Sequence, residues 1–148
     1  MPVRATLDSN ILVYAELEPE TEKGERAKRV IAEAAPRGIL AVQALLEFVA
    51  VVRRRRPASL ESGLAKVAVW SAVFETAPTT AVVARNAAAL VRAHDLQVWD
   101  AVIWSAARAA GASIFLSEDL HDGLAIDGMR VVNPLTLSIA AIEDLLRP

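Results

Sequence analysis

The stretch Val3-Arg4-Ala5-Thr6-Leu7-Asp8-Ser9-Asn10-Ile11-Leu12 decides the fold. Residues 3–7 are apolar enough for a short buried strand, which Asp8 ends, and a helix is expected from Asn10 to about Leu17. Open α/β sheets collect their ligands beyond the carboxyl ends of their strands, so Asp8 is a candidate site residue. Aspartate is also a favoured N-cap, which gives Asp8 an equally good structural explanation. Asn10 could orient Asp8 or contact a phosphate, or simply add polarity to the first helical turn.

The rest of the chain alternates short apolar segments with longer amphipathic ones. Strands are expected at residues 39–42, 113–116 and 129–132, and residues 74–77 could form another. Helices are expected at residues 20–35, 43–56 and 60–74. Three more are expected later in the chain: one capped by Thr79 or Thr80 that ends near residue 94, one from near residue 100 to 111, and one in the region after Pro134. Strands that alternate with helices indicate one α/β domain over residues 1–148, built around a mostly parallel sheet.

The composition limits the chemistry. The 148 residues include no cysteine, which excludes disulfides and thiolate metal sites and makes a cytoplasmic location the expectation. The two histidines, His94 and His121, do not form a ligand-spaced pair, so oxygen ligands and therefore Mg²⁺ or Mn²⁺ are favoured. The net charge of −2 does not indicate a general nucleic-acid binder. No apolar run reaches the roughly 18 residues of a membrane span, and no signal peptide is indicated.

Four carboxylates adjoin apolar stretches, where a lone charge is unexpected. They are Asp8 after residues 3–7, Glu47 within residues 44–52, Asp100 within residues 98–104, and Asp119 after residues 114–118. Burying an unpaired carboxylate costs several kcal/mol, so such a residue needs a compensating partner. If all four meet at one place they repel one another, and a divalent cation would stabilise the cluster.

Each of these acids also has a structural explanation. Asp100 lies near a helix start, where the helix dipole stabilises an anion. Asp119 lies in a polar turn in which aspartate is common, Asp122 competes with it for the same role, and Glu118 is expected to face solvent. Glu47 is the hardest to explain structurally, because Val51 at i+4 offers no ion pair, although its helix face could still meet water. The hypothesis of a metal site therefore depends on the acids converging.

Four stretches in series resemble the PIN-domain ribonucleases, and among them the small toxins of VapC type from toxin–antitoxin pairs. The matching stretches are Leu7-Asp8-Ser9-Asn10-Ile11-Leu12, Gln43-Ala44-Leu45-Leu46-Glu47, Val98-Trp99-Asp100-Ala101-Val102-Ile103 and Leu116-Ser117-Glu118-Asp119-Leu120. No single stretch is specific, but their order, spacing and the total length all fit. The resemblance implies a PIN-like three-layer sandwich, with a mostly parallel central sheet of four to five short strands flanked by helices.

The resemblance also implies a function and its residues. It implies a Mg²⁺-dependent endoribonuclease, with Mn²⁺ as a substitute, whose acidic cluster is Asp8, Glu47, Asp100 and Asp119. Asp8 and Asp100 would be the direct ligands, Glu47 would position or deprotonate the attacking water, and Asn10 and Ser117 would support the site, with Asp122 as the alternative to Asp119. It further implies a homodimer, an RNA substrate, and a cognate antitoxin whose tail occupies the groove beside the acids.

The basic and aromatic residues are open to two interpretations. Residues 53–56 are four arginines that could grip RNA phosphates, although cations at a helix end also complement its dipole. The same choice applies to four cations of the second helix, which could also contact the antitoxin: Lys23, Arg26, Lys28 and Arg29. Trp70, Trp99 and Trp104 are more often core residues than base-stacking platforms, and Trp99, which adjoins Asp100, is the one candidate for a role at the groove.

Two rival functions use the same acids. A phosphohydrolase with an aspartyl nucleophile would place Asp8 at the end of the first strand, but such enzymes usually need a second acid at the position of Asn10. A metal-stabilised module could instead bind RNA or protein without cleaving it. No glycine-rich phosphate-binding loop is present.

Overall fold

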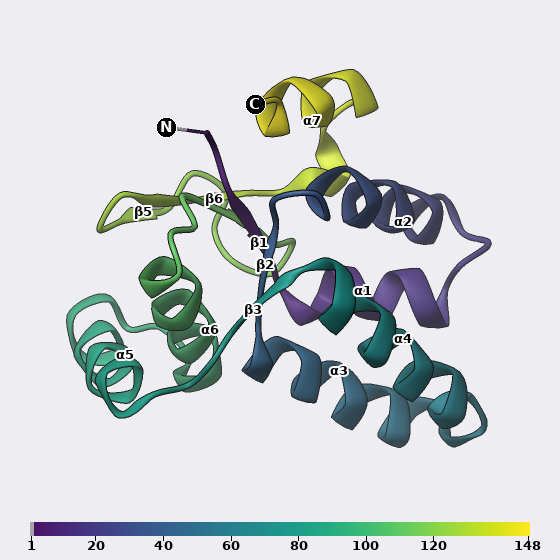
Figure 1. Cartoon of the computed structure of the whole chain (residues 1–148), viewed down its shortest axis with the longest axis horizontal. Coiled ribbons are helices and arrows are strands. Elements are labelled where there is room, and N and C mark those ends of the chain that lie inside the picture. The colour runs from purple at the N-terminus through teal and green to yellow at the C-terminus, as the bar shows by residue number, and fades with distance from the viewer. Residues whose placement is uncertain (1) are drawn as a thin grey trace.

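The computed structural model describes residues 2–148, along which short strands alternate with helices (Figure 1). The strands are β1 (Ala5–Leu7), β2 (Ile39–Ala41), β3 (Glu75–Ala77), β4 (Ile114–Leu116), β5 (Ala125–Ile126) and β6 (Met129–Val132). The helices are α1 (Ser9–Leu17), α2 (Glu22–Ala34), α3 (Val42–Arg55), α4 (Leu60–Val73), α5 (Ala81–His94), α6 (Val98–Ala109) and α7 (Ile139–Leu146), with 3₁₀ turns at Pro57–Ser59 and Pro134–Thr136. Within residues 2–148 there is no helix with the length and hydropathy of a membrane span.

The strands form one sheet in the order β3-β2-β1-β4-β6-β5. All neighbouring strands are parallel except β5, which pairs with β6 in the antiparallel direction. In the register of the two central strands, Leu7 of β1 lies opposite Leu116 of β4. Both strands therefore end at the same level, and the residues that follow them, Asp8 and Ser117, become neighbours.

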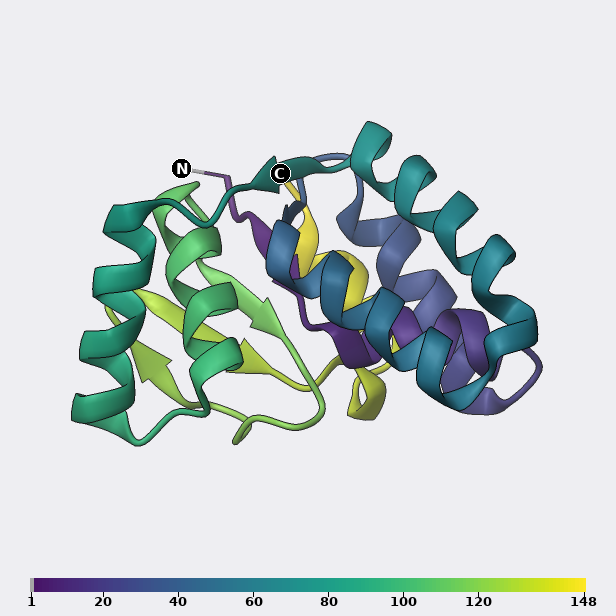
Figure 2. The same ribbon diagram turned by 90° about the horizontal axis from the view of Figure 1, so that it is seen from below.

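Helices cover both faces of the sheet, which makes three layers. Helices α5 and α6 lie on one side, and α1, α2, α3, α4 and α7 gather on the other (Figures 1 and 2). The strand residues alternate between the two sides, so Leu7 and Leu116 join the core under the larger helix group, whereas Phe115 joins the core under α5 and α6. The strands β1, β2 and β4 are buried on both faces, as is usual for parallel sheets, whereas the edge strands β3 and β5 are partly exposed.

Two of the three tryptophans anchor these cores, as the sequence predicted. Trp70 of α4 meets Phe48 of α3 edge-on at 4.9 Å between ring centroids. Trp104 of α6 stacks on Phe115 of β4, with centroids 5.4 Å apart and an interplanar angle of 18°. Trp104 thereby holds α6, and with it Asp100 one turn earlier, against the sheet.

The expected α/β sandwich is confirmed, with one strand more than the four to five predicted. The additional strand, β5, has two residues and forms a hairpin with β6, so it is too short for hydrophobic periodicity to indicate it. Residues 75–77, which the sequence left open, form the edge strand β3. Val42 was assigned to a strand, but it is the first residue of α3 because β2 passes into that helix without a loop.

A close approach of α2 to the end of α1 yields a stability prediction. A Cβ atom on Gly24 would lie 1.7 Å from the carbonyl oxygen of Glu18, so a side chain there forces the helices apart. Gly24→Ala should lower the free energy of unfolding by about 1–3 kcal/mol, although alanine is the better helix former. Chemical denaturation measures the effect.

Gly63→Ala in α4 is the matched control. Its added Cβ would meet Val52 Cγ1 at 3.3 Å, a contact that a side chain can relieve. We expect its stability to stay within about 1 kcal/mol of the parent, because helix propensity offsets the tight contact. Equal losses for both variants would mean that the clash at Gly24 is not the cause.

Candidate metal centre

Asp8 is held rigidly where β1 ends. Its backbone N–H donates to the carbonyl of Leu116 at 2.9 Å, which extends the pairing with β4 by one residue. The carboxylate is 4% exposed; Oδ1 accepts from the Ser9 backbone N–H at 2.7 Å and Oδ2 accepts from the Ser117 hydroxyl at 2.7 Å. Asp8 is thus the N-cap of α1 and also lies at the ligand-collecting edge of the sheet. The two explanations of Asp8 are compatible.

Glu47 reaches the same edge from the first half of α3. The Ser9 hydroxyl donates to Glu47 Oε2 at 3.2 Å, and Ser9 adjoins Asp8 in the chain. Ser9 therefore links the two acids, a role that sequence reasoning missed because serine is ordinary in a first helical turn. Glu47 is half-buried, and so are Gln43 and Val51 on the same helix face, so this face meets water in part.

Asp100 lies in the first turn of α6, but it does not cap the helix. The N-cap is Gln97, whose side-chain oxygen accepts from the backbone N–H groups of Trp99 and Asp100 at 2.9 and 3.0 Å. The capping explanation of Asp100 therefore belongs to Gln97. The Asp100 carboxylate is left half-buried, with the helix dipole as its one local stabilisation.

The pKa values of three carboxyls rise because the groups are buried and, to a smaller extent, because the acids repel one another. Burial, followed by repulsion from Asp8, Glu47 and Asp119, raises the pKa of Asp100 to about 7. Burial also raises the pKa of Asp8 and of Glu47; hydrogen bonds from Ser9 and Ser117 partly offset the shift at Asp8, and one from Ser9 does so at Glu47. The charges that act most strongly on these carboxyls are negative, so among residues 2–148 no strong cation compensates the cluster.

The turn after β4 carries Asp119 and Asp122, which have different surroundings. Asp119 is exposed, its N–H donates to the Ser117 hydroxyl at 3.2 Å, and its charge acts on both Asp8 and Asp100. Asp122 accepts from the backbone N–H of Asn133 at 3.0 Å and is not among the charges that act on those carboxyls. The charge of Asp119 therefore raises the pKa of carboxyls in the cluster, whereas that of Asp122 is not among the causes.

Glu118 corrects a prediction, because it does not face solvent. Its side chain is half-buried, and Oε1 accepts from Lys23 Nζ at 2.9 Å and from the Tyr14 hydroxyl at 3.4 Å. Lys23 also lies 4.5 Å above the Tyr14 ring. The wrong expectation came from treating the turn as isolated, whereas α1 and α2 pack beside it.

The side-chain amide of Asn10 lacks hydrogen-bond partners. Both polar atoms of its amide, Oδ1 and Nδ2, are buried and have no partner among residues 2–148. A buried amide without a partner costs about 1–3 kcal/mol, so a ligand or water should contact it. Asn10 lies one helical position after Ser9, and its predicted supporting role stays a prediction.

The residues present suit an oxygen-bound divalent cation, although they do not enclose one. Within residues 2–148, no three acidic or histidine side chains stand close enough to share a metal ion. Charge repulsion acts over about 10 Å, whereas Mg²⁺ ligands lie at about 2.1 Å, so the acids can be coupled without forming a cage. Carboxylates without a strong cation and the unpartnered Asn10 amide, all oxygen donors, fit Mg²⁺ or Mn²⁺.

Exposed apolar side chains adjoin two of the acids in the sequence. Trp99 and Val98 are each 50% exposed at the start of α6, next to Asp100, and Leu46 is 58% exposed next to Glu47. Trp99 therefore lies outside the core, unlike Trp70 and Trp104, and its role in a groove stays a prediction.

The cations of α2 and Arg56 already have partners inside the chain. On α2, Lys28 forms an ion pair with Glu25, and Arg29 forms ion pairs with both Glu33 and Glu143. Arg26 of the same helix donates to the carbonyl of Leu137. Residues 53–55 complement the last turn of α3, and Arg56 donates to the carbonyl of Leu17 at 2.6 Å. These contacts support the structural interpretation of both groups.

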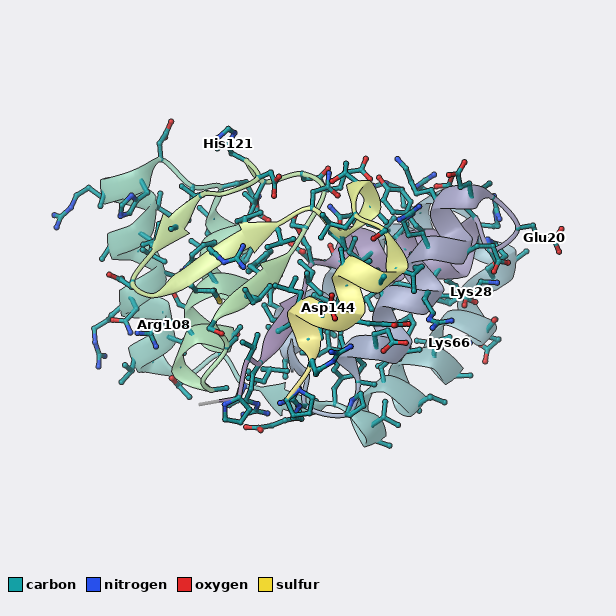
Figure 3. The ribbon with its side chains drawn as sticks, turned by 90° about the horizontal axis from the view of Figure 1, so that it is seen from above. Glu20, Lys28, Lys66, Arg108, His121 and Asp144 are labelled. Atoms are coloured by element: carbon teal, nitrogen blue, oxygen red, sulfur yellow. The ribbon has the colours of Figure 1, made fainter. Side chains whose placement is uncertain are left out.

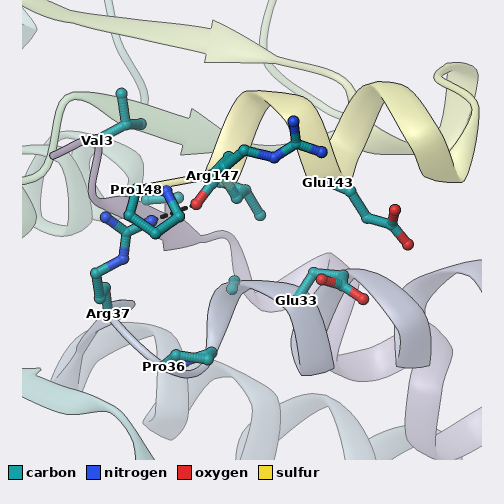
Figure 4. A pocket seen from close by; sticks show the side chains of 10 residues that line it. Val3, Glu33, Pro36, Arg37, Glu143, Arg147 and Pro148 are labelled. Carbon is teal, nitrogen blue, oxygen red and sulfur yellow. Dashed lines mark hydrogen bonds between the residues drawn. The ribbon is translucent and has the colours of Figure 1, made fainter.

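A cavity of about 380 Å³ lies between the end of α2 and α7, at the amino end of β1 (Figure 4). Arg37 donates to the carbonyl of Leu146 beside it, and Glu33 and Glu143 line it. None of the four acids lines this cavity, so it is separate from the acidic cluster.

Comparison with known proteins gives the family. The family model described as PIN domain matches residues 5–121, which include all four acids. The chain belongs to the PIN domain family. A comparison with curated proteins found no match.

Solved structures share the PIN fold of this chain. A sarcin–ricin loop cleaving VapC toxin of Mycobacterium tuberculosis superposes with a TM-score of 0.66 at 19% identity, over 78% of this chain and 89% of that one. A toxin–antitoxin complex of Klebsiella pneumoniae superposes with a TM-score of 0.67 at 19% identity, over 88% of this chain and 97% of that one. The VapBC2 complex of Rickettsia felis, bound to a promoter DNA fragment, superposes with a TM-score of 0.63 at 16% identity, over 87% of this chain and 97% of that one. At these identities the likeness concerns the fold.

The raised pKa of Asp100 yields a prediction about stability and pH. Between about pH 4 and pH 7 the folded carboxyl keeps a proton that the unfolded one releases, so its contribution to stability falls as the pH rises through this range. Asp100→Asn should raise the melting temperature of the metal-free protein by a few degrees at about pH 8, and much less at about pH 5. Thermal unfolding monitored by circular dichroism measures both values.

Asp95→Asn is the control, because Asp95 is exposed after α5 and is not among the charges that act on Asp100. It should change the melting temperature little at either pH. An equal gain from Asp100→Asn at both pH values would mean that the cost of ionising the Asp100 carboxyl, from burial and repulsion, is not its origin.

Proposed function

We propose that this protein is a metal-dependent endoribonuclease and the toxin of a toxin–antitoxin pair. The observation that carries the proposal is the acidic cluster around the buried Asp8, which has no strong cation and lies at the carboxyl edge of a PIN-type sheet. The Mycobacterium tuberculosis structure is described as a toxin that cleaves the sarcin–ricin loop, which supports RNA as the substrate class.

The chain offers a role for each residue of the cluster. Asp8 and Asp100 would hold the Mg²⁺ or Mn²⁺ ion, with Asp119 completing the set. When bound, the ion supplies neutralisation of phosphate charge and lowers the pKa of a water molecule. Glu47, kept in place by Ser9, orients that water and accepts its proton.

The remaining polar groups orient the acids and the substrate. Ser117 fixes Asp8 through a 2.7 Å hydrogen bond. The unpartnered Asn10 amide would contact the ion or a phosphate oxygen of the substrate. Attack of the water in line on phosphorus breaks the P–O3′ bond and leaves a 5′-phosphate and a 3′-hydroxyl. These products follow from hydrolysis by water and need no 2′-hydroxyl as nucleophile.

A cognate antitoxin is the proposed protein partner. The Klebsiella pneumoniae and Rickettsia felis neighbours are toxin–antitoxin complexes, which supports it. We place the antitoxin tail in the groove beside the acids, where the exposed Leu46, Val98 and Trp99 could be covered. A homodimer and a cytoplasmic location complete the proposal, and the latter suits both an RNA substrate and a chain without cysteine.

Cleavage of RNA by the antitoxin-free protein tests the chemistry. With Mg²⁺ the protein should cut a structured RNA, and EDTA in place of Mg²⁺ should abolish cutting. Asp8→Asn should reduce the rate at least about a hundredfold, because it removes a ligand charge and leaves an amide in its place. Gel analysis of end-labelled RNA measures the rate and identifies the 5′-phosphate.

Asp144→Asn is the matched control, since Asp144 is exposed on α7 and pairs with Arg147 (Figure 3). It should keep full activity. Cutting that persists in EDTA, or in Asp8→Asn, would exclude the proposed mechanism. RNA that binds tightly but stays intact with Mg²⁺ would favour a non-cleaving module.

A second comparison asks which acid of the β4 turn completes the site. Asp119→Asn should lower the cleavage rate about tenfold or more and raise the Mg²⁺ concentration needed, because Asp119 acts on Asp8 and Asp100. Asp122→Asn should keep the rate and lose only a little stability, because its oxygen still accepts from Asn133. The reverse ranking would assign the role to Asp122.

A further inference from the structure

Helix α3 carries an acid of the cluster and an arginine on the same face. Glu47 and Arg54 are separated by close to two helical turns, so their side chains leave the helix in nearly the same direction. With a rise of about 1.5 Å per residue, their backbones lie roughly 10 Å apart along the axis. The helix starts at the end of β2 and extends away from the sheet (Figure 1). Arg54 therefore lies beyond the acidic cluster, on the face that it shares with Glu47.

The surface between Glu47 and Arg54 carries no opposing charge from α3. Ala50 and Val51 occupy the intervening turn of this face; Ala50 is exposed and Val51 is half-buried. Glu47 is the only carboxylate in the sequence of α3. A polyanion that leaves the acidic cluster along this face therefore passes small apolar side chains and then meets a cation.

The charge of Arg54 is not compensated inside the chain. Arg53, Arg54 and Arg55 are exposed, and none of them forms an ion pair with a carboxylate of residues 2–148. The dipole of α3 stabilises these cations in its last turn, but it leaves the N–H donors of their guanidinium groups free for other partners. Complementing the dipole and binding an anion are therefore compatible at Arg54.

We propose that Arg54 binds a phosphate of the RNA strand about three nucleotides from the bond that is cut. This inference rests on the proposed function, which puts the scissile phosphate at the acids beside Glu47. A stacked strand rises about 3.4 Å per nucleotide, so the distance of roughly 10 Å from Glu47 to Arg54 corresponds to about three nucleotides. A guanidinium suits a phosphate because two of its N–H groups can donate to two phosphate oxygens. The face of α3 from Glu47 to Arg54 is then the surface along which one arm of the substrate lies.

The neighbouring arginine provides a matched control. Arg53 points about 100° away from Arg54 around the helix, and it shares its direction with the exposed Leu46 instead of Glu47. Both arginines are exposed in the last turn of α3, where they complement the dipole in the same way. A difference between their variants therefore reports the direction of the side chain, and not the net charge or the helix dipole.

Binding of a labelled RNA tests the contact without relying on cleavage. Fluorescence anisotropy follows the titration of a single-stranded RNA of about twelve nucleotides with the Asp8→Asn protein, from about 50 to 200 mM salt. Adding Arg54→Gln should weaken binding about three- to tenfold at the lowest salt. It should also reduce the slope of log affinity against log salt by about 0.7, as expected for one phosphate contact with a single strand.

Adding Arg53→Gln instead should weaken binding by less than about twofold, because an exposed charge without a direct contact contributes little. Equal losses in the two variants, or a salt slope that Arg54→Gln leaves unchanged, would overturn the proposal. Circular dichroism checks that both variants keep the helix content of the parent.

Cleavage by the protein with Asp8 intact places the contact along the substrate. Arg54→Gln should raise KM with a much smaller effect on kcat, because the contact is equally strong before and during the reaction. Trimming the RNA to one nucleotide on one side of the mapped cut should remove this difference in KM. A difference that survives trimming on either side would overturn the position assigned to Arg54. RNA that binds through Arg54 but is never cut would contradict the proposed function and leave the contact standing, whereas RNA that does not bind the parent would overturn both.

Discussion

The parallel pairing of β1 with β4 is the constraint on which the site depends. It sets Leu7 opposite Leu116, and it therefore places Asp8 and Ser117 side by side although 109 positions separate them in the chain. The hydrogen bond from Ser117 and the one from the Ser9 backbone occupy both oxygens of a nearly buried carboxylate. The other three acids are positioned relative to this one: Glu47 through Ser9, Asp100 through the packing of α6 on the sheet, and Asp119 through Ser117.

The cost of this arrangement is electrostatic. Carboxylates brought together without a strong cation raise one another's pKa, and Asp100 reaches a value of about 7 at the start of a helix that should favour its charge. A protein gains nothing in stability from such a cluster. Together with the unpartnered Asn10 amide, it indicates that the site is shaped for a ligand absent from the polypeptide itself.

Helix α6 carries two kinds of polar residue at different positions. Its first turn holds Asp100 beside the acidic cluster, whereas Arg108 in its last turn donates to the carbonyl of Asp127. Between them, Trp104 stacks on Phe115 and fixes the helix against the sheet. The position of Asp100 therefore depends on contacts at both ends of the helix and in its middle.

The sequence by itself determined the helices and the central strands, and it singled out the four acids as candidates, because apolar periodicity and charge in apolar surroundings are local signals. It could not indicate β5, whose two residues are stabilised only by β6, or the burial of Glu118, which depends on α1 and α2 packing beside its turn. It did not single out Ser9 or Gln97 either. Only the tertiary structure decided these points, because each depends on which atoms from distant parts of the chain lie within a few ångströms, and sheet register and helix packing set those distances.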